Sequence, residues 1–315
     1  MVSKQNKLTA SLLLLCINFS VNAFTINLDY SYDNGFFNNA TRLNAMDSAA
    51  SFFEARITDS FGAITSSGIN SMTARFFDPG IGDPSPITDI ISVQDFSVGT
   101  DAITVFVGGS DMATGFLAWG GVGGYTVSNG SDQVFRDSIE NRGPTGITTG
   151  SNADEFTPWG GSISFDNSGT TWDFDSSDGI SGFDFFSVAI HELGHVLGLG
   201  IADSWDSLVN TDNEGKKTFT GNNSRPVYGS DVPLTDDGAH WEAGTDSYVN
   251  GVLQEAAMDP NIGSGIRKEF TDLDMAALDD IGWEIAPVPL PPALLLFGSG
   301  LLGFLGLRRH QRQLA

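Results

Sequence analysis

Cysteine is almost absent from this chain of 315 residues. The only one, Cys16, lies in an N-terminal segment that we expect to be removed. The mature chain would then form no disulfide bond, and no thiolate could block a metal site. Histidine is also scarce. His310 lies in a basic C-terminal tail, so only His191, His195 and His240 remain for the folded part.

Basic residues are also few in this chain. The chain has 15 Lys and Arg against 39 Asp and Glu, and its formal net charge is −24. Five of the basic residues and none of the acidic ones lie in 1–23 and 293–315, so removing those segments leaves a net charge of −29. Such a surface repels phosphate backbones and anionic lipids. We therefore expect no nucleic-acid partner and a protein that stays soluble outside the cell.

Residues 1–23 have the pattern of a secretory signal peptide. Lys4 and Lys7 precede an apolar run at 12–17, and Val-Asn-Ala at 21–23 fits a cleavage site with small residues. A buried N-terminal helix is the alternative, but the segment is short and has basic flanks. This pattern predicts export.

A sorting signal is predicted at the C-terminus, where a linker at 287–292 leads into a tail at 293–315. Residues 293–307 form a 15-residue apolar run, which is short for a membrane span, and arginines follow it. The stretch VPLPPA with this run resembles the sorting signal of PEP-CTERM proteins in its VPLPxA variant. The resemblance covers about 28 residues. It implies an exosortase-type sorting enzyme in a Gram-negative bacterium, a transient stay in the inner membrane, and release to the cell surface or extracellular matrix.

The body at 24–286 is predicted to be one α+β domain, with an N-terminal subdomain to about residue 198 and a C-terminal subdomain at 199–286. Alternating apolar residues predict strands, and apolar residues three or four apart predict helices. The predicted strands are 24–30, 72–77, 102–109 and 160–166, and the predicted helices are 41–57, the segment around 191–195, and 271–281 with Thr271 as its cap. Loops are predicted for the rest of 108–182, and a loop-rich structure for 201–257.

The most informative stretch is His-Glu-Leu-Gly-His at 191–195. On a helix, residues i and i+4 share one face, so both imidazoles can bind one ion. The apolar run at 183–190 fits a buried helix, and Gly198 is placed to end it. Chance matches to this motif are common, but this context favours a metal site. Zinc held by three protein ligands keeps one position for water, and Glu192 is placed to take a proton from that water.

A third ligand is needed, and several residues compete for the role. The motif resembles the compact metzincin pattern, which implies a further ligand six residues after His195, but the chain has Ile201 there, which cannot bind zinc. The alternatives are Asp203, Glu214 in a polar turn, and His240, which follows His195 by 45 residues. His240 is favoured because imidazole nitrogen suits zinc. A surface histidine beside a tryptophan is the other interpretation of His240.

Three segments carry a family resemblance. HELGHVLGLG at 191–200, AHWE at 239–242 and AAMDP at 256–260 resemble the metzincin zinc peptidases, above all their leishmanolysin-type arrangement, and the helix also resembles that of matrixins. The likeness covers about 130 residues. It implies a zincin-like fold, with a twisted mixed sheet, an active-site helix and a loop-rich C-terminal subdomain. It assigns the metal ligands to His191, His195 and His240, the general base to Glu192, the turn glycine to Gly198, and the methionine beneath the zinc to Met258.

The same resemblance extends to a strand and a helix. WGGSISFD at 159–166 resembles the upper edge strand of matrixins, which implies that Ser162, Ile163 and Ser164 pair with an extended substrate. TDLDMAALDDIGW at 271–283 resembles the closing helix of secreted bacterial enzymes of this kind.

A second metal is considered at an acidic stretch. WDFDSSDG at 172–179 offers Asp173, Asp175 and Asp178 as hard oxygen ligands. The spacing does not fit the usual calcium-binding loop, so Ca²⁺ binding and a solvated turn are both kept as interpretations.

These features predict an exported zinc endopeptidase that cleaves a protein or peptide substrate, with Glu192 as the general base. The alternative is a non-enzymatic matrix or adhesion protein that keeps a zincin fold. Glu192 favours the enzyme, because a purely structural zinc needs no general base.

Overall fold

The structure is a computed structural model that describes residues 24–81, 89–112, 115–140, 142 and 159–286. The predicted signal peptide at 1–23, linker at 287–292 and tail at 293–315 lie outside these residues, so their roles stay predictions. Among the described residues, no helix combines the length and the apolar character that crossing a bilayer requires.

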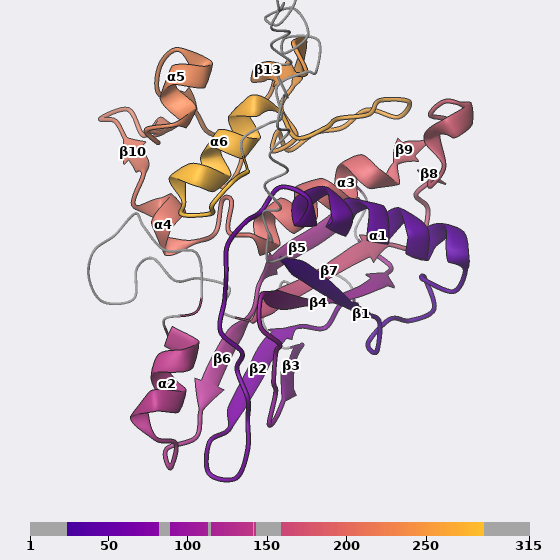
Figure 1. The fold of residues 1–315 in the computed structure, drawn as a ribbon. Coiled ribbons are helices and arrows are strands. Elements are labelled where there is room, and N and C mark those ends of the chain that lie inside the picture. Colours follow the sequence, from indigo (N-terminus) through magenta and orange to yellow (C-terminus); the bar gives the residue numbers. More distant parts are fainter. Residues whose placement is uncertain (1–23, 82–88, 113–114, 141, 143–158, 287–315) are drawn as a thin grey trace, which may run out of the picture.

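A four-stranded sheet forms the centre of the molecule (Figure 1). Its order is β1-β4-β7-β5, with strands at Thr25–Asp29 (β1), Ala102–Ser110 (β4), Gly160–Asp166 (β7) and Ala118–Val122 (β5). β1, β4 and β7 run parallel, whereas β5 pairs antiparallel with β7. This mixed sheet with its helices confirms the predicted α+β class, and β1, β4 and β7 lie where the sequence predicted strands.

The sheet is buried on both faces, as the residues of β4 show. Ile103, Val105 and Val107 belong to the larger hydrophobic core on the helical side, whereas Ala102 and Phe106 belong to a second core. Successive side chains of a strand point to opposite faces, which explains the alternation. A strand covered on both faces has no polar side to expose, and this is why its sequence is almost continuously apolar.

Two helices, α1 (Ala40–Glu54) and α3 (Phe185–Val196), cover the first of these faces (Figure 1). Asn39 caps α1 and Asp184 caps α3, each through a side chain that accepts a hydrogen bond from a first-turn amide. Both helices confirm predictions. The apolar run predicted to be helical from its first residue starts instead with a two-residue strand, β9 (Phe183–Asp184).

A second, antiparallel sheet carries the smaller core on the other side of the central sheet (Figure 1). Its order is β3-β2-β6, at Ile90–Val93 (β3), Met72–Phe77 (β2) and Gly124–Val127 (β6), and α2 (Gln133–Glu140) lies beside it. The prediction of loops for the rest of 108–182 is wrong, because β5, β6 and α2 all lie there. These elements are short, and the two strands are rich in glycine. A periodic pattern of apolar residues therefore cannot be recognised in them.

Short elements alternate with loops after α3, as predicted. They are α4 (Asp203–Asp206), β10 (Val209–Thr211), β11 (Lys217–Phe219), α5 (Ser224–Tyr228), β12 (Val232–Pro233), β13 (Asp246–Val249) and β14 (Val252–Glu255). The last helix, α6 (Asp272–Asp280), has the predicted cap, in which Thr271 and Asp274 form a capping box. Beyond it, the indole N–H of Trp283 donates to the carbonyl oxygen of Leu197 at 2.7 Å, which ties the end of the body to the end of α3.

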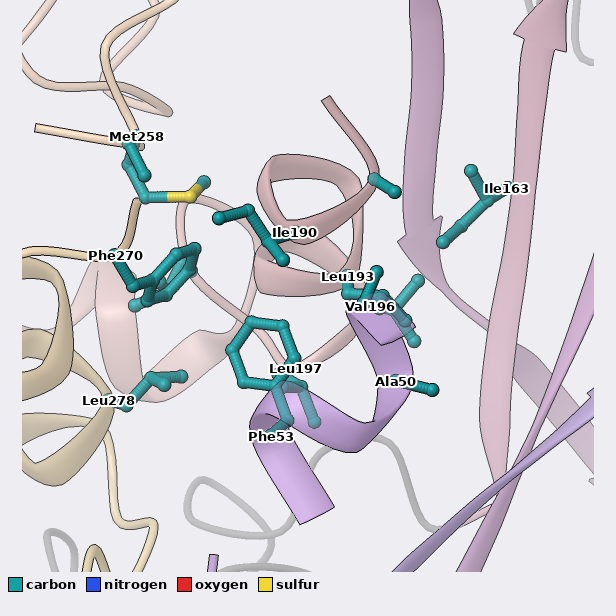
Figure 2. Close-up of a cluster of buried hydrophobic side chains, with 14 of the residues drawn as sticks. Ala50, Phe53, Ile163, Ile190, Leu193, Val196, Leu197, Met258, Phe270 and Leu278 are labelled. Carbon is teal, nitrogen blue, oxygen red and sulfur yellow. The ribbon is translucent and has the colours of Figure 1, made fainter. Parts of the chain in front are cut away.

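One hydrophobic core joins α1, α3 and the C-terminal elements. Figure 2 shows Met258 and Phe270 beside Ile190 of α3, with Phe53 of α1 below them. Phe53, Ile190 and Met258 are at most 1% exposed. Burying a side chain of this size contributes about 1.5–3 kcal/mol. Packing on several sides thus fixes the position of α3 and of the motif that it carries.

Candidate metal centre

Three histidine side chains converge on one point, although they come from distant segments. The Nε2 atom of His195 lies 3.1 Å from Nε2 of His191 and 3.1 Å from Nε2 of His240. The first two are one turn apart on α3, and His240 is on the loop before β13. Within the described residues, this is the one group of three His, Cys, Asp or Glu side chains close enough to share an ion.

Hydrogen bonds at the other ring nitrogens determine which nitrogen carries the proton. Nδ1 of His191 lies 2.7 Å from the carbonyl oxygen of Ala257, and Nδ1 of His195 lies 2.8 Å from that of Leu199. A carbonyl oxygen only accepts, so each Nδ1 carries the hydrogen and each Nε2 presents a lone pair. Lone pairs that face each other at 3.1 Å repel unless a cation lies between them. A set of three neutral imidazole nitrogens suits zinc.

Burial keeps the three rings neutral. It lowers the pKa of His191 to about 3, with His240 as the second cause, and it holds the pKa of His195 well below its ordinary value. Burial also lowers the pKa of His240, against the opposing effect of Asp237, whose carboxylate oxygen lies 3.8 Å from His240 Nδ1. Metal ligands must be unprotonated, so the site can bind a cation at neutral pH without first losing protons.

His240 reaches α3 because its loop packs against the turn that ends the helix. Gly200 has a φ of 76°, and a Cβ at that position would collide with the carbonyl oxygen of Ala239. Glycine therefore allows the two segments to lie this close. Asp203 and Glu214, the alternative third ligands, are exposed and stand outside the histidine cluster. The structure thus places His240, and neither alternative, beside the helix pair.

Glu192 is 7% exposed and faces β5. The amide of Gly120 in β5 donates a hydrogen bond to its carboxylate. Burial raises the pKa of Glu192 to about 8, and the hydrogen bond acts in the opposite direction. A cation on the neighbouring histidines would favour the ionised carboxylate. Sequence reasoning missed Gly120, because nothing in a glycine-rich strand marks an amide that will meet a carboxylate.

Met258 packs against the helix that carries His191 and His195. It is 1% exposed. A Cβ on Gly194 would lie 2.7 Å from the Met258 sulfur, so the thioether touches the backbone of α3 between His191 and His195. The missing side chain at Gly194 is therefore what lets the segment of Met258 approach α3.

The buried carboxylate of Asp274 holds this turn to α6. It accepts hydrogen bonds from the amides of Ala257 at 2.9 Å and Met258 at 3.2 Å, and from the indole N–H of Trp241 at 2.8 Å. The carbonyl oxygen of Ala257 accepts from His191, and Trp241 directly follows His240. The Asp274 side chain therefore steadies the surroundings of two of the three histidines. The sequence predicted its helix but none of these contacts, which join residues far apart in the chain.

The histidines line a cleft of about 1000 Å³, which is bordered by β5 and by the segment after Met258. This arrangement corrects the predicted edge strand. β7 lies between β4 and β5, and Ser162, Ile163 and Ser164 are at most 5% exposed. In the part of the chain that the structure describes, the edge of the sheet beside the cleft is β5. The sequence pattern identified the right sheet but not its outermost strand, because pairing between distant segments decides strand order.

The three side chains considered for calcium do not converge in the described chain. The carboxylate of Asp173 accepts from the amides of Asp175 at 3.0 Å and Ser181 at 2.7 Å, and that of Asp175 accepts from the amide of Ser177 at 3.0 Å. These are the bonds of a turn that caps itself. Calcium binding by Asp173, Asp175 and Asp178 gains no support from this geometry.

Comparison with known proteins points in the same direction as the histidine geometry. The Matrixin family model matches residues 135–220, which include α3 and its two histidines. Human matrix metalloproteinase-25 is 46% identical over 52 residues, which are 16% of this chain and 9% of that protein's length. No solved structure matches the chain. The two matches support a metzincin-type zinc metallopeptidase.

Proposed function

We propose that this metzincin-type metallopeptidase is a zinc-dependent endopeptidase that cleaves extended protein or peptide substrates, with Glu192 as the general base. The observation that carries the proposal is a buried carboxylate beside three neutral, converging imidazoles. His191, Glu192 and His195 come from one helix, and His240 completes the set. A structural zinc is enclosed by four protein ligands, whereas these three histidines line an open cleft.

Zinc held by the three Nε2 atoms would act as a Lewis acid towards a peptide carbonyl and would lower the pKa of water. Glu192 is placed to accept a proton from a water molecule in the cleft and to pass it to the leaving peptide nitrogen. Burial raises the pKa of its carboxyl, whereas a cation on the neighbouring histidines would keep the carboxylate ionised and ready to accept that proton. The Gly120 amide keeps the carboxylate oriented while the proton moves.

The free edge of β5 supports an extended substrate. The carbonyl of Leu117 and the amide of Gly123 bond inward to β7. Polar backbone groups alternate along an antiparallel strand, so those of Ala118, Gly120 and Val122 point to the edge that is unpaired among the described residues, where the Gly120 amide already donates to Glu192. A peptide that adds there as a further strand would gain backbone hydrogen bonds with little demand on its sequence.

Export and sorting are part of the same proposal, and they rest on sequence patterns alone. The segment at 1–23 would direct the chain out of the cytoplasm. The tail at 293–315 would hold it in the inner membrane until an exosortase-type enzyme acts on the linker. An acidic body suits an enzyme that then works at the cell surface or in the extracellular matrix.

The experiment that tests the activity is Glu192→Gln, assayed on casein or a quenched-fluorescence peptide. The variant should keep its zinc and lose at least about a hundredfold in turnover, because general base catalysis supplies that much. Glu214→Gln, at an exposed turn, is the matched control and should behave as the wild type. A wild-type protein that binds zinc and hydrolyses nothing would favour the non-enzymatic matrix or adhesion protein.

A further inference from the structure

The outer ring nitrogen of His240 has a different neighbour from those of the other two histidines. Nδ1 of His191 and Nδ1 of His195 each meet a backbone carbonyl oxygen. Nδ1 of His240 instead faces a carboxylate, with Oδ2 of Asp237 at 3.8 Å. This distance is within the range of an ion pair but too long for a direct hydrogen bond. A carboxylate carries a full negative charge at neutral pH, so the three rings are supported in two different ways.

The turn at 235–240 fixes the direction of the Asp237 carboxylate. Its Oδ1 atom accepts from the hydroxyl of Thr235 at 2.5 Å and from the amide of Ala239 at 2.9 Å. The same hydroxyl oxygen accepts from the amide of His240 at 3.3 Å, and the amide of Thr235 donates to the His240 carbonyl oxygen at 3.0 Å. Contacts within the turn thus occupy Oδ1, and Oδ2 is left for the imidazole.

Side chains from two neighbouring elements anchor this turn. The indole N–H of Trp205 in α4 donates to the carbonyl oxygen of Gly238 at 2.9 Å, and the indole is fully buried. The ammonium group of Lys217 in β11 donates to the carbonyl oxygen of Asp237, also at 2.9 Å. The position of Asp237 beside His240 therefore follows from the packing of the C-terminal elements.

We propose that Asp237 is a positioning residue of the metal centre, whose carboxylate orients the His240 ring and strengthens the binding of a divalent cation at its Nε2 atom. This inference deepens the proposed function, since it assumes that the three histidines hold zinc. An anion beside one imidazole nitrogen makes the opposite nitrogen a better donor, and such outer partners change metal affinity by about 10- to 100-fold. The Asp237 side chain is 63% exposed, so water screens part of its charge. The effect should therefore lie near the lower end of that range.

The test is the zinc affinity of Asp237→Asn, measured at neutral pH by competition with a chromophoric chelator. Asparagine keeps an oxygen that can accept from Thr235 and Ala239, but it carries no charge. The variant should bind zinc about tenfold more weakly than the wild type. Asp237→Glu, which retains the charge, should recover part of that affinity. Thermal unfolding of the metal-free protein should be the same for Asp237→Asn and the wild type, which would assign the loss to the metal site and not to the fold.

Asp236→Asn is the matched control, because Asp236 is the preceding exposed carboxylate of the same turn and does not line the cleft. It removes the same charge and should leave the zinc affinity unchanged. Equal losses in both variants would reveal an effect of net charge alone and would overturn the role of Asp237, as would wild-type affinity in Asp237→Asn. A wild type that binds zinc but hydrolyses no peptide would contradict the proposed function and leave this role standing, because the readout is metal affinity. If the wild type binds no zinc, both proposals fail.

Discussion

Single residues decide which side chains form the histidine cluster, and the least local of them is His240. It follows His195 by 45 residues, and nothing in that spacing brings them together. The close approach of Gly200 to Ala239 does so, since it lays the loop against the end of α3. This loop contact therefore brings His240, and neither Asp203 nor Glu214, to the other two histidines.

His240→Ala should lose zinc and peptidase activity together, because two ligands on a helix do not complete the site. Asp203→Ala and Glu214→Ala should keep both, since these side chains are exposed and outside the histidine cluster. Zinc stoichiometry by mass spectrometry or atomic absorption measures the outcome. Full zinc occupancy in His240→Ala would show that another residue is the third ligand.

The stability of the fold should also depend on pH through Asp59, which lies outside the histidine cluster. It is 6% exposed, accepts a hydrogen bond from the amide of Glu284 at 2.7 Å, and has its pKa raised by burial from 3.8 to about 6. The folded state therefore holds this proton more tightly than the unfolded state. The stability that this proton contributes is fully present below about pH 4 and is lost as pH rises through about 6.

Asp59→Asn should accordingly stabilise the fold at pH 7, by about 1–3 kcal/mol on the scale of 1.36 kcal/mol per pKa unit, and much less at pH 4. The amide oxygen of Asn can still accept from Glu284. Urea unfolding of variant and wild type at both pH values measures the difference, in which the metal contribution cancels. Equal effects at the two pH values would argue against a raised pKa.

At the scale of elements, the position of β5 outside β7 matters most. β7 bonds to a strand on each side, whereas β5 has its outer backbone groups at the cleft. A strand at an edge can take a substrate, and an interior strand cannot. The same substitution should therefore have different effects in the two strands.

Ala118→Pro removes an amide that points to the free edge, and proline is tolerated at such positions. The variant should fold, bind zinc and show a raised KM. Ser164→Pro, in contrast, interrupts a strand that is paired on both sides, and should destabilise the fold by about 3 kcal/mol or more. Thermal unfolding and peptide kinetics together distinguish the two outcomes. Wild-type KM in a folded Ala118→Pro variant would count against substrate pairing along β5.

For the whole molecule, the site depends on both ends of the described body. α3 lies between α1 and the turn that Asp274 holds to α6, and the chain after α6 returns to pair Ile285 with Ile57 beyond α1. Both hydrophobic cores and all three histidines lie within residues 24–286. We propose that the terminal segments act as export and sorting signals and that this body folds without them.

Residues 24–286 expressed alone should therefore be soluble, folded and able to bind zinc. The full chain, expressed without a sorting enzyme, should fractionate with membranes, because its apolar run is followed by arginines. Fractionation, circular dichroism and zinc content measure this. A shortened chain that is insoluble, beside a soluble full chain, would show that the tail belongs to the fold.

Local periodicity was sufficient for what a single helix or strand carries. The placement of His191, Glu192 and His195 on one helix could be predicted from spacing, because helical geometry depends only on neighbouring residues. The capping of α6 by Thr271, and the strands β1, β2, β4 and β7, follow from the same local rules.

Contacts between distant segments decided the rest. They place β5 outside β7, bring Ala239 to Gly200 so that His240 joins the other two histidines, and direct the Gly120 amide at Glu192. Each of these arrangements depends on the packing of the whole chain, in which many small contributions add up. No window of neighbouring residues contains that sum, and this is why the edge strand became visible only in the folded molecule.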